Sequence, residues 1–240
     1  MTMSTALITG ASRGLGREIA LALAQRGWRL VVDARTSSDL AATADELRRA
    51  GAAEVAAIVG SVAEPDHREA LTEAVDELGG LNLLVNNASM LGPSPQPPLA
   101  TYPLDKLEEV YAVNVFAPLA LTQELLPRLR AGRARILNIT SDAAIEPYDG
   151  WGGYGSSKAA LNQWTAILGA EESDVLVYAF DPGDMRTVMH QEAFPGEDIS
   201  DRPEPFTVVP AVLRLVDEQL PSGRYRVSAL LEQQPAEVIA

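Results

Sequence analysis

Short apolar runs alternate with longer amphipathic stretches along the whole chain. The apolar runs predict strands over residues 5–9, 29–33, 54–59, 81–85, 133–140, 175–180 and 225–227. The amphipathic stretches predict helices over residues 17–26, 40–50, 69–78, 104–129, 152–171 and 208–219. Alternating strands and helices are typical of a parallel sheet covered on both faces. We therefore expect a doubly wound α/β fold of about seven strands, in which residues 1–240 form a single domain.

One segment, residues 86–103, interrupts this alternation. It contains Pro93, Pro95, Pro97, Pro98 and Pro103. These prolines make a helix or a central strand implausible there. The segment follows a buried strand, and doubly wound folds bind ligands at the carboxyl ends of their strands. It is either a stiff surface connection or a wall of a substrate site. The helix after it is expected to bend at Pro118 or Pro127.

A glycine-rich turn joins the first strand to the first helix, with the sequence Thr9-Gly10-Ala11-Ser12-Arg13-Gly14-Leu15-Gly16. Glycines let the backbone turn sharply and approach a pyrophosphate closely. The backbone N–H groups and the positive end of the helix would then hold the anion. The spacing, G-x-x-x-G-x-G, differs from the commoner G-x-G-x-x-G. The turn indicates nucleotide binding, although a glycine-rich turn can also be only a turn.

Tyr154 and Lys158 lie four residues apart in Y-G-S-S-K, so on a helix both side chains project from the same face. A phenol is a weak acid, with an unperturbed pKa of about 10. A neighbouring ammonium group favours the phenolate, which lowers that pKa and suits the tyrosine for proton transfer at neutral pH. The alternative is that both side chains are solvated on a helix surface.

Together these motifs resemble those of the short-chain dehydrogenase/reductases over nearly the whole chain. The glycine turn matches their T-G-x-x-x-G-x-G, and residues 154–158 match their Y-x-x-x-K. Their N-N-A-G is present at residues 86–89, with Ser89 in place of the glycine. Their P-G after the sixth strand is Pro182-Gly183. The resemblance implies a Rossmann-type fold and hydride transfer between a nicotinamide ring and a carbonyl carbon.

The resemblance also implies a catalytic set, namely Asn114, Ser141, Tyr154 and Lys158. During reduction Tyr154 would supply the proton, and Ser141 would donate a hydrogen bond to the carbonyl oxygen. Lys158 would lower the pKa of Tyr154 and bind the nicotinamide ribose. Asn114 would hold a water that links Lys158 to solvent. Taken alone, Asn114 could equally be a buried helix asparagine, and Ser141 could cap a turn.

The cofactor preference depends on the end of the second strand, where an acidic side chain accepts hydrogen bonds from ribose hydroxyls and repels a 2′-phosphate. The family's acidic position falls on Ala34, and Asp33, one residue earlier, should point to the other face of the strand. Arg35 and Arg13 can pair with a phosphate, so NADP(H) is the expected cofactor. A register slip that placed Asp33 at the ribose would reverse this preference. The resemblance places the cofactor-binding residues at Gly10, Ser12, Arg13, Gly14, Leu15, Gly16, Arg35, Ser61, Val62, Asn87, Ala88, Tyr154, Lys158, Pro182, Gly183 and Met185.

Further stretches resemble the sepiapterin-reductase branch of the family, among them residues 86–92, 150–151, 181–187 and 189–191. That branch reduces the side-chain ketones of pterins, and some relatives reduce diketones such as benzil. Its pterin-binding aspartate falls on Ser228, whose neutral hydroxyl cannot pair with a pterin as a carboxylate would. We therefore expect a small apolar or aromatic ketone or diketone as substrate. Its pocket would be lined by Tyr148, Trp151, Met185, Met189 and Phe194, with residues 185–194 as a mobile cover.

Two other functions stay open. One is a 3-oxoacyl carrier-protein reductase, which would turn over acetoacetyl thioesters. The other is a non-catalytic protein that senses NADP(H) and regulates a partner. The formal net charge of −14 disfavours an acidic protein partner such as an acyl carrier protein. It also argues against binding to nucleic acid or to an anionic membrane through a general basic field.

Composition narrows the class of protein further. Hydrophobic residues make up 47% of the chain, which is enough for a packed core, and no apolar run is long enough to span a bilayer. The absence of cysteine excludes disulfides and thiolate metal ligands. His67 and His190 are far apart in sequence, so we expect no metal site, and His67 should lie on the surface near a helix start. We expect a cytoplasmic enzyme without a signal peptide, associated as a homodimer or homotetramer through helices 104–129 and 152–171.

Overall fold

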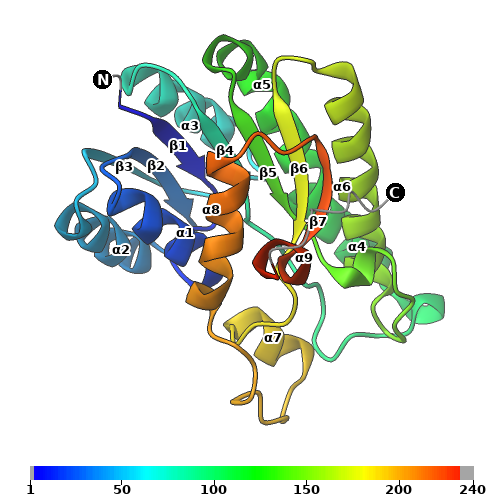
Figure 1. Cartoon of the computed structure of the whole chain (residues 1–240). Helices are drawn as coiled ribbons and strands as arrows, with labels where there is room; N and C mark the ends of the chain where they lie inside the picture. Colours follow the sequence, from blue (N-terminus) through cyan, green and yellow to red (C-terminus); the bar gives the residue numbers. More distant parts are fainter. Residues whose placement is uncertain (1–2, 233–240) are drawn as a thin grey trace.

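Seven parallel strands form one sheet in the computed structural model, which describes residues 3–232. They are β1 (Thr5–Ile8), β2 (Arg29–Ala34), β3 (Glu54–Val59), β4 (Leu83–Asn86), β5 (Arg135–Ile139), β6 (Leu176–Asp181) and β7 (Gly223–Arg226). Their order in the sheet is β3-β2-β1-β4-β5-β6-β7 (Figure 1). All neighbouring pairs are parallel. The expected doubly wound, Rossmann-type sheet is confirmed.

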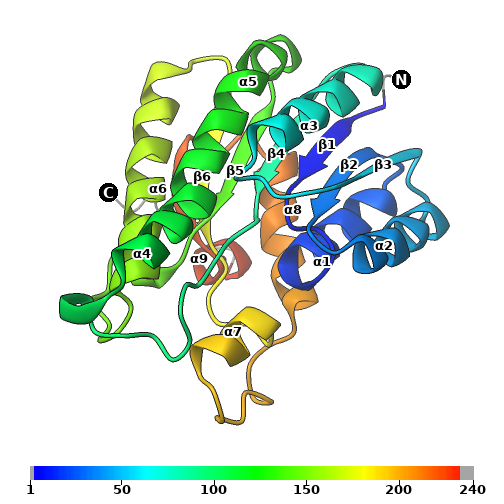
Figure 2. The same cartoon turned by 180° about the vertical axis from the view of Figure 1, so that it is seen from behind.

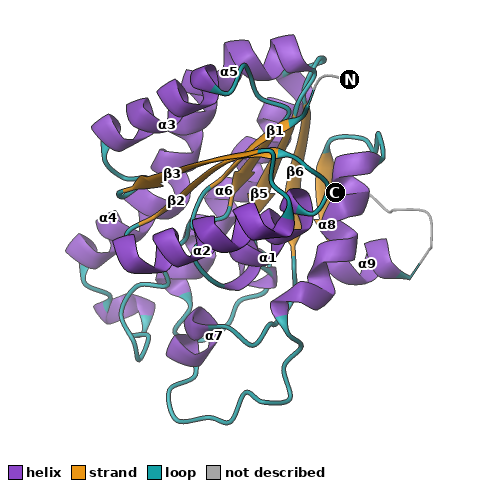
Figure 3. Ribbon diagram, turned by 90° about the vertical axis from the view of Figure 1, so that its left-hand side faces the viewer, coloured by secondary structure: helices purple, strands orange, loops and turns teal. Residues whose placement is uncertain are grey.

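Helices cover both faces of the sheet, as Figures 1, 2 and 3 show from three sides. They are α1 (Gly14–Ala24), α2 (Ser37–Ala50), α3 (Pro65–Glu77), α4 (Leu104–Tyr111), α5 (Ala117–Gly132), α6 (Gly152–Glu171), α7 (Val188–Ala193), α8 (Val209–Asp217) and α9 (Val227–Leu231). Short 3₁₀ turns lie at η1 (Leu99–Thr101), η3 (Asp142–Ala144) and η4 (Pro205–Val208). One hydrophobic core joins the sheet to α1, α2 and α8, and a second joins it to α3, α5 and α6.

Side chains alternate between these two cores along each strand, because successive Cβ atoms of a strand point to opposite faces. In β2, Val31 belongs to the core under α3 and α5, whereas Val32 belongs to the core under α1 and α2. Asp33 is two residues after Val31 and therefore points toward α3. Ala34 returns to the α1 side. The sequence predicted this division of the two residues correctly.

The predicted helix over residues 104–129 is interrupted. A π-helical turn, Ala112–Phe116, separates α4 from α5. Pro118 has no N–H with which to bond the carbonyl of Asn114 four residues earlier, so a regular helix cannot continue there. Pro127 lies inside α5 without ending it. The helix was expected to bend at Pro118 or Pro127. The structure has instead a π-helical turn that ends shortly before Pro118.

The strand order reverses between β1 and β4, and the chain leaves the carboxyl ends of these two strands in opposite directions. Residues 86–103 start there and are irregular apart from η1, as their prolines predicted. Beyond the same ends of the strands lies α7 (Figure 1). No helix within residues 3–232 has both the length and the apolar character needed to cross a bilayer.

Candidate active site

One cavity of about 630 Å³ runs along the carboxyl ends of the strands. Loops after β1 to β6 all contribute to its walls. It brings together most of the residues singled out in the sequence, namely Gly10, Ser12, Arg13, Gly14, Leu15, Arg35, Ser61, Val62, Asn87, Ala88, Ser141, Tyr154, Lys158, Pro182, Gly183 and Met185. Segments more than 170 residues apart therefore form a single site.

The glycine turn is braced from the loop after β4. The amide of Asn87 donates to the carbonyl oxygens of Thr9 and Gly10, at 2.9 and 3.0 Å. In return the Thr9 hydroxyl accepts the backbone N–H groups of Asn87 and Ala88 at 3.0 Å. Gly10 has a positive φ of 65°, which favours glycine. These bonds hold the turn open toward the start of α1, where backbone N–H groups suit a pyrophosphate.

Gly16 and Asn114 do not line the cavity wall, although both were expected in the site. Gly16 is a packing residue, because a Cβ there would lie 2.6 Å from the carbonyl oxygen of Gly10 and 2.5 Å from the amide of Asn87. It allows α1 to approach the glycine turn, which still serves the cofactor site indirectly.

Two arginines at the adenosine end of the cavity are suited to a phosphate. Arg13 and Arg35 are exposed and border the cavity, and neither makes an ion pair within residues 3–232. Ser61 and Val62 border the same end from the loop after β3. A guanidinium group can bind a phosphate with two hydrogen bonds. This end of the site therefore fits a dinucleotide that carries a 2′-phosphate.

His67 was expected on the surface, and this expectation is wrong. Its side chain is buried, and Nε2 lies 2.9 Å from Oδ2 of Asp33. The other carboxylate oxygen of Asp33 accepts the N–H of Gly10 at 2.6 Å. The helix that begins at Pro65 turns His67 toward the sheet instead of toward solvent. Sequence position at a helix start did not reveal which side of the helix this residue occupies.

Tyr154 and Lys158 lie in the first turns of α6, as predicted, and both are buried at the cavity. Nζ of Lys158 lies 5.4 Å from the centre of the Tyr154 ring and donates to the carbonyl oxygen of Ile139 at 2.8 Å. Small residues allow this placement, because a Cβ on Gly155 would lie 2.7 Å from the carbonyl oxygen of Ala143. The helix can therefore lie close against the loop after β5.

Burial shifts the pKa values of both groups toward their neutral forms. It lowers the pKa of Lys158 to about 7. Burial likewise raises the pKa of Tyr154 above its ordinary value, the neighbouring Ser89 hydroxyl lowers it in part, and the carboxylates of Asp181 and Asp142 raise it further. Lys158 is not among the groups that shift the pKa of Tyr154 in this structure, so the lowering expected from the sequence stays a prediction.

Ser141 follows β5, and its hydroxyl makes hydrogen bonds with two neighbouring residues. It donates to Oδ1 of Asp142 at 2.9 Å and accepts the N–H of Ala143 at 3.1 Å. The capping role considered from the sequence is thus real, and it coexists with a position on the cavity wall. Oδ2 of Asp142 accepts the hydroxyl of Tyr148 at 2.9 Å. Asp142 therefore orients Ser141, a contact that no sequence motif indicated.

Asn114 sits in the π-helical turn with its amide fully bonded. Its Oδ1 accepts the N–H of Met90 at 2.8 Å and the Ser89 hydroxyl at 3.1 Å. Its Nδ2 donates to the carbonyl oxygen of Met90 at 2.8 Å and to the Ser157 hydroxyl at 2.9 Å. The side chain has no further donor or acceptor to offer. A water bound to Asn114 would have to donate a hydrogen bond to its backbone carbonyl oxygen. Pro118, four residues later, has no N–H to donate to that oxygen.

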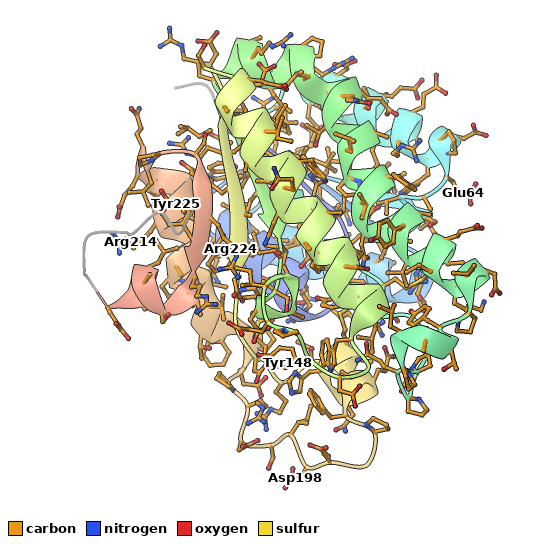
Figure 4. The ribbon with its side chains drawn as sticks, turned by 90° about the vertical axis from the view of Figure 1, so that its right-hand side faces the viewer. Glu64, Tyr148, Asp198, Arg214, Arg224 and Tyr225 are labelled. Atoms are coloured by element: carbon orange, nitrogen blue, oxygen red, sulfur yellow. The ribbon has the colours of Figure 1, made fainter. Side chains whose placement is uncertain are left out.

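An apolar wall closes the other end of the cavity. Trp151, Met185 and Met189 line it, as expected. Tyr148 and Phe194 instead pack against Trp151 from behind, with ring centres 6.0 and 5.8 Å from the indole. The segment that follows α7 projects away from the body of the molecule, and Figure 4 labels Asp198 at its far end. Ser228 belongs to α9 and lies outside the cavity.

A buried ion pair joins β6 to β7 beside the cavity. Asp181 at the end of β6 accepts from Arg224 on β7 at 2.7 Å, and the same guanidinium lies 3.4 Å from the carbonyl oxygen of Ser141. Figure 4 labels Arg224. The N–H of Gly183 donates to the other oxygen of Asp181 at 3.1 Å. The pair thus connects the loop after β5 that carries Ser141, the serine loop, to the loop that begins at Pro182.

Comparison with known proteins agrees with this geometry. Fold and site together define a dinucleotide-binding oxidoreductase. The chain belongs to the short chain dehydrogenase family, whose model matches residues 4–198. It is 34% identical to a benzil reductase ((S)-benzoin forming) of Bacillus subtilis over 194 residues, which cover 78% of this chain and 76% of that protein. It is 33% identical to a sepiapterin reductase of Xenopus laevis over 202 residues, with 78% and 75% covered.

Solved structures of the family superpose closely on the chain. A short chain dehydrogenase from Pseudomonas syringae has a TM-score of 0.88 and 30% identity, covering 93% of this chain and 94% of that one. A short chain dehydrogenase from Escherichia coli CFT073 in complex with NADPH has a TM-score of 0.86 and 25% identity, covering 94% and 98%. Family membership, NADPH-bound neighbours and the arginines at the cavity support NADP(H) as the cofactor.

Proposed function

We propose that this protein is an NADP(H)-dependent carbonyl reductase for small apolar or aromatic ketones and diketones. The observation that carries the proposal is the meeting of Ser141, Tyr154 and Lys158 on one cavity wall, with the apolar surface of Trp151, Met185 and Met189 beside them. A substrate held between these groups would have its carbonyl oxygen near two hydroxyl donors and its apolar part against the indole.

In the reduction direction the carbonyl oxygen gains negative charge, and bound NADPH supplies the hydride. Ser141 turns its hydroxyl from Asp142 to that oxygen, and Tyr154 transfers its phenolic proton to it. A positively charged Lys158 stabilises the phenolate that remains. Gly10, Asn87 and the N-terminal end of α1 hold the pyrophosphate, and Arg13 and Arg35 hold the 2′-phosphate.

Proton return to Tyr154 would pass through Lys158. We propose that the backbone carbonyl of Asn114, rather than its amide, holds the water that links Lys158 to solvent. Two observations support this assignment: the amide is already fully bonded, and Pro118 leaves the carbonyl without its usual helical donor.

The diketone preference draws on the likeness to the benzil reductase and on the aromatic wall. Sepiapterin itself is disfavoured, since Ser228 lies outside the cavity and offers no carboxylate to a pterin. A 3-oxoacyl carrier-protein reductase is disfavoured by the net charge of −14. A purely sensing role is disfavoured because the proton-transfer residues are all present. The cytoplasmic location stays a prediction.

The first prediction tests this function directly. NADPH oxidation is followed with benzil and other diketones, quinones, pterins, keto esters and acetoacetyl thioesters, with NADH in parallel. We expect turnover of aromatic diketones with NADPH, and a fall of about 10³-fold in Tyr154→Phe, because the general acid is removed. NADPH binding, followed by its fluorescence, should be unchanged in that variant. Near-normal turnover in Tyr154→Phe would refute the mechanism, and tight binding without turnover of any carbonyl would favour the sensing role.

A further inference from the structure

The carboxylate of Asp142 lies on the cavity wall next to the hydroxyl proposed to bind the substrate carbonyl. Its Oδ1 accepts the Ser141 hydroxyl at 2.9 Å and the N–H of Ala143 at 2.8 Å, and its Oδ2 accepts the Tyr148 hydroxyl at 2.9 Å. Asp142 and Ser141 are both half-buried and both border the cavity. The three donors hold the carboxylate in place, but each of them is uncharged, so its negative charge is not neutralised.

The basic side chains at this end of the cavity do not compensate that charge. Asp142 makes no ion pair with any other residue in the range 3–232. Arg186 borders the cavity but pairs with Glu204. His190 also borders it, and its Nδ1 lies 3.9 Å from Oδ1 of Asp184. Both basic groups therefore have carboxylates of their own.

A substrate positioned for reduction comes close to this carboxylate. Its carbonyl oxygen would accept the Ser141 hydroxyl, whose oxygen is itself 2.9 Å from Oδ1 of Asp142. Two hydrogen bonds that share one oxygen place the carbonyl oxygen within about 6 Å of Oδ1. Lys158 also borders this end of the cavity, but burial lowers its pKa to about 7, so at pH 8 it is mostly neutral and offsets little of the charge.

The charge of Asp142 distinguishes substrates by what is attached to their carbonyl carbon. A carboxylate attached there would lie near Asp142, and like charges repel strongly where protein replaces water. An ester, alkyl or aryl group in the same place meets no such repulsion. Trp151, Met185 and Met189 complete this part of the wall and offer a substrate carboxylate no positive charge.

We propose that Asp142 is a specificity-determining residue that selects against keto acids, so that the site takes uncharged ketones and diketones. The proposal deepens the proposed function and rests on it, but it concerns substrate binding and not hydride transfer. It predicts that charged and uncharged ketones respond differently to the loss of the Asp142 charge. A carboxylate that only held Ser141 in place would affect both kinds of ketone to the same extent.

The test compares methyl phenylglyoxylate with phenylglyoxylate, which share the phenyl group and the keto carbon but differ in charge. Isothermal titration gives the dissociation constants of both ketones for the NADP⁺ complex at pH 8, and NADPH oxidation gives kcat/KM for both. Asp142→Asn keeps an oxygen that can accept the Ser141 hydroxyl but removes the charge. The preference for the ester over the acid should fall about tenfold or more in this variant, in both measurements.

Glu146→Gln is the matched control, because Glu146 is exposed in the same loop, lies outside the cavity wall and changes the net charge by the same amount. Its ester preference should equal that of the unmodified protein. Asp142→Ser is a second neutral variant that should behave like Asp142→Asn, and circular dichroism checks the folding of each. An unchanged preference in a folded neutral variant, or an equal fall in Glu146→Gln, overturns the proposal. Failure of both ketones to bind also overturns it, whereas binding without NADPH oxidation contradicts only the proposed function.

Discussion

At the scale of single residues, burial opposes the charged forms of the two groups proposed for proton transfer. Lys158 is 2% exposed and Tyr154 is 8% exposed. Burial lowers the pKa of Lys158 from 10.5 to about 7, so the folded protein releases this proton far more readily than the unfolded chain does. Burial raises the pKa of Tyr154, so the folded protein keeps that proton longer.

These shifts give a pH dependence of stability with a definite sign. Between about pH 7 and 10.5 the unfolded chain binds the Lys158 proton and the folded protein does not, so the free energy of unfolding should rise with pH by up to about 1.4 kcal/mol per unit. Above about pH 10.5 the free energy of unfolding should fall, because the unfolded chain ionises this tyrosine before the folded protein does. Urea unfolding across this range is the measurement.

Lys158→Met supplies the control for this second prediction. The variant should lose the rise between pH 7 and 10.5 and should be more stable than the unmodified protein at pH 6, where the buried ammonium is fully charged. If the free energies of unfolding of the two proteins changed with pH in parallel, the lowered pKa of Lys158 would be contradicted.

The spacing of residues in the sequence identified several members of this site but not their side-chain contacts. Tyr154, Lys158 and the glycine turn are contiguous motifs, so they could be recognised without knowing any contact. The pairing of Asp33 with His67 depends on how α3 packs on the sheet, and the bonding of Asn114 depends on the irregular segment at Met90. Local patterns carry no information about such partners.

At the scale of elements, the strands and helices followed the apolar pattern closely, and the departures have local causes. The π-helical turn appears where Pro118 follows Asn114, a combination that the sequence contains but whose form depends on tertiary contacts. The last strand, Gly223–Arg226, begins two residues earlier than its apolar pattern suggested. The strand contains few apolar residues because one of its buried positions is occupied by Arg224, which forms an ion pair with Asp181.

The third prediction concerns that strand. Arg224→Met leaves Asp181 buried beside a smaller residue and without its main partner, which should lower the free energy of unfolding by about 3–5 kcal/mol. Arg226→Met is the matched control, since the Arg226 side chain is 40% exposed and lies 3.6 Å from the same carboxylate. Its loss should cost less than about 1 kcal/mol. Equal losses of unfolding free energy in the two variants, measured with urea, would show that the buried Asp181–Arg224 pair stabilises the fold no more than the longer contact of Arg226 does.

At the scale of the whole molecule, apolar side chains remain exposed on the two helical segments that were expected to mediate association. Leu104 and Phe116 are 72% and 60% exposed on the helix that was expected to mediate association, and Ile167 is 47% exposed on α6. Large apolar surfaces on a folded protein often mark interfaces. The predicted homodimer or homotetramer would cover these side chains. Because each chain carries a formal net charge of −14, two copies repel one another, and association would depend on a specific apolar interface.

The fourth prediction follows from these exposed side chains. Phe116→Glu should convert the assembly to monomers, because an interface buries a carboxylate poorly. Phe206→Glu is the control, since Phe206 is also 60% exposed but belongs to η4 on the opposite side of the sheet. Sedimentation velocity of both variants gives the answer. A variant at Phe116 that sediments like the unmodified protein would exclude this surface as the interface.

The tie between Ser141 and Arg224 spans 83 positions of the chain and ends in an edge strand. The serine loop therefore has this support only when the final strand has paired with β6. Tyr225 of that strand also belongs to the core cluster that includes Leu15 and Ile19 of α1. Removal of the C-terminal edge of the sheet should thus disturb the serine loop and the glycine-turn side of the cavity together.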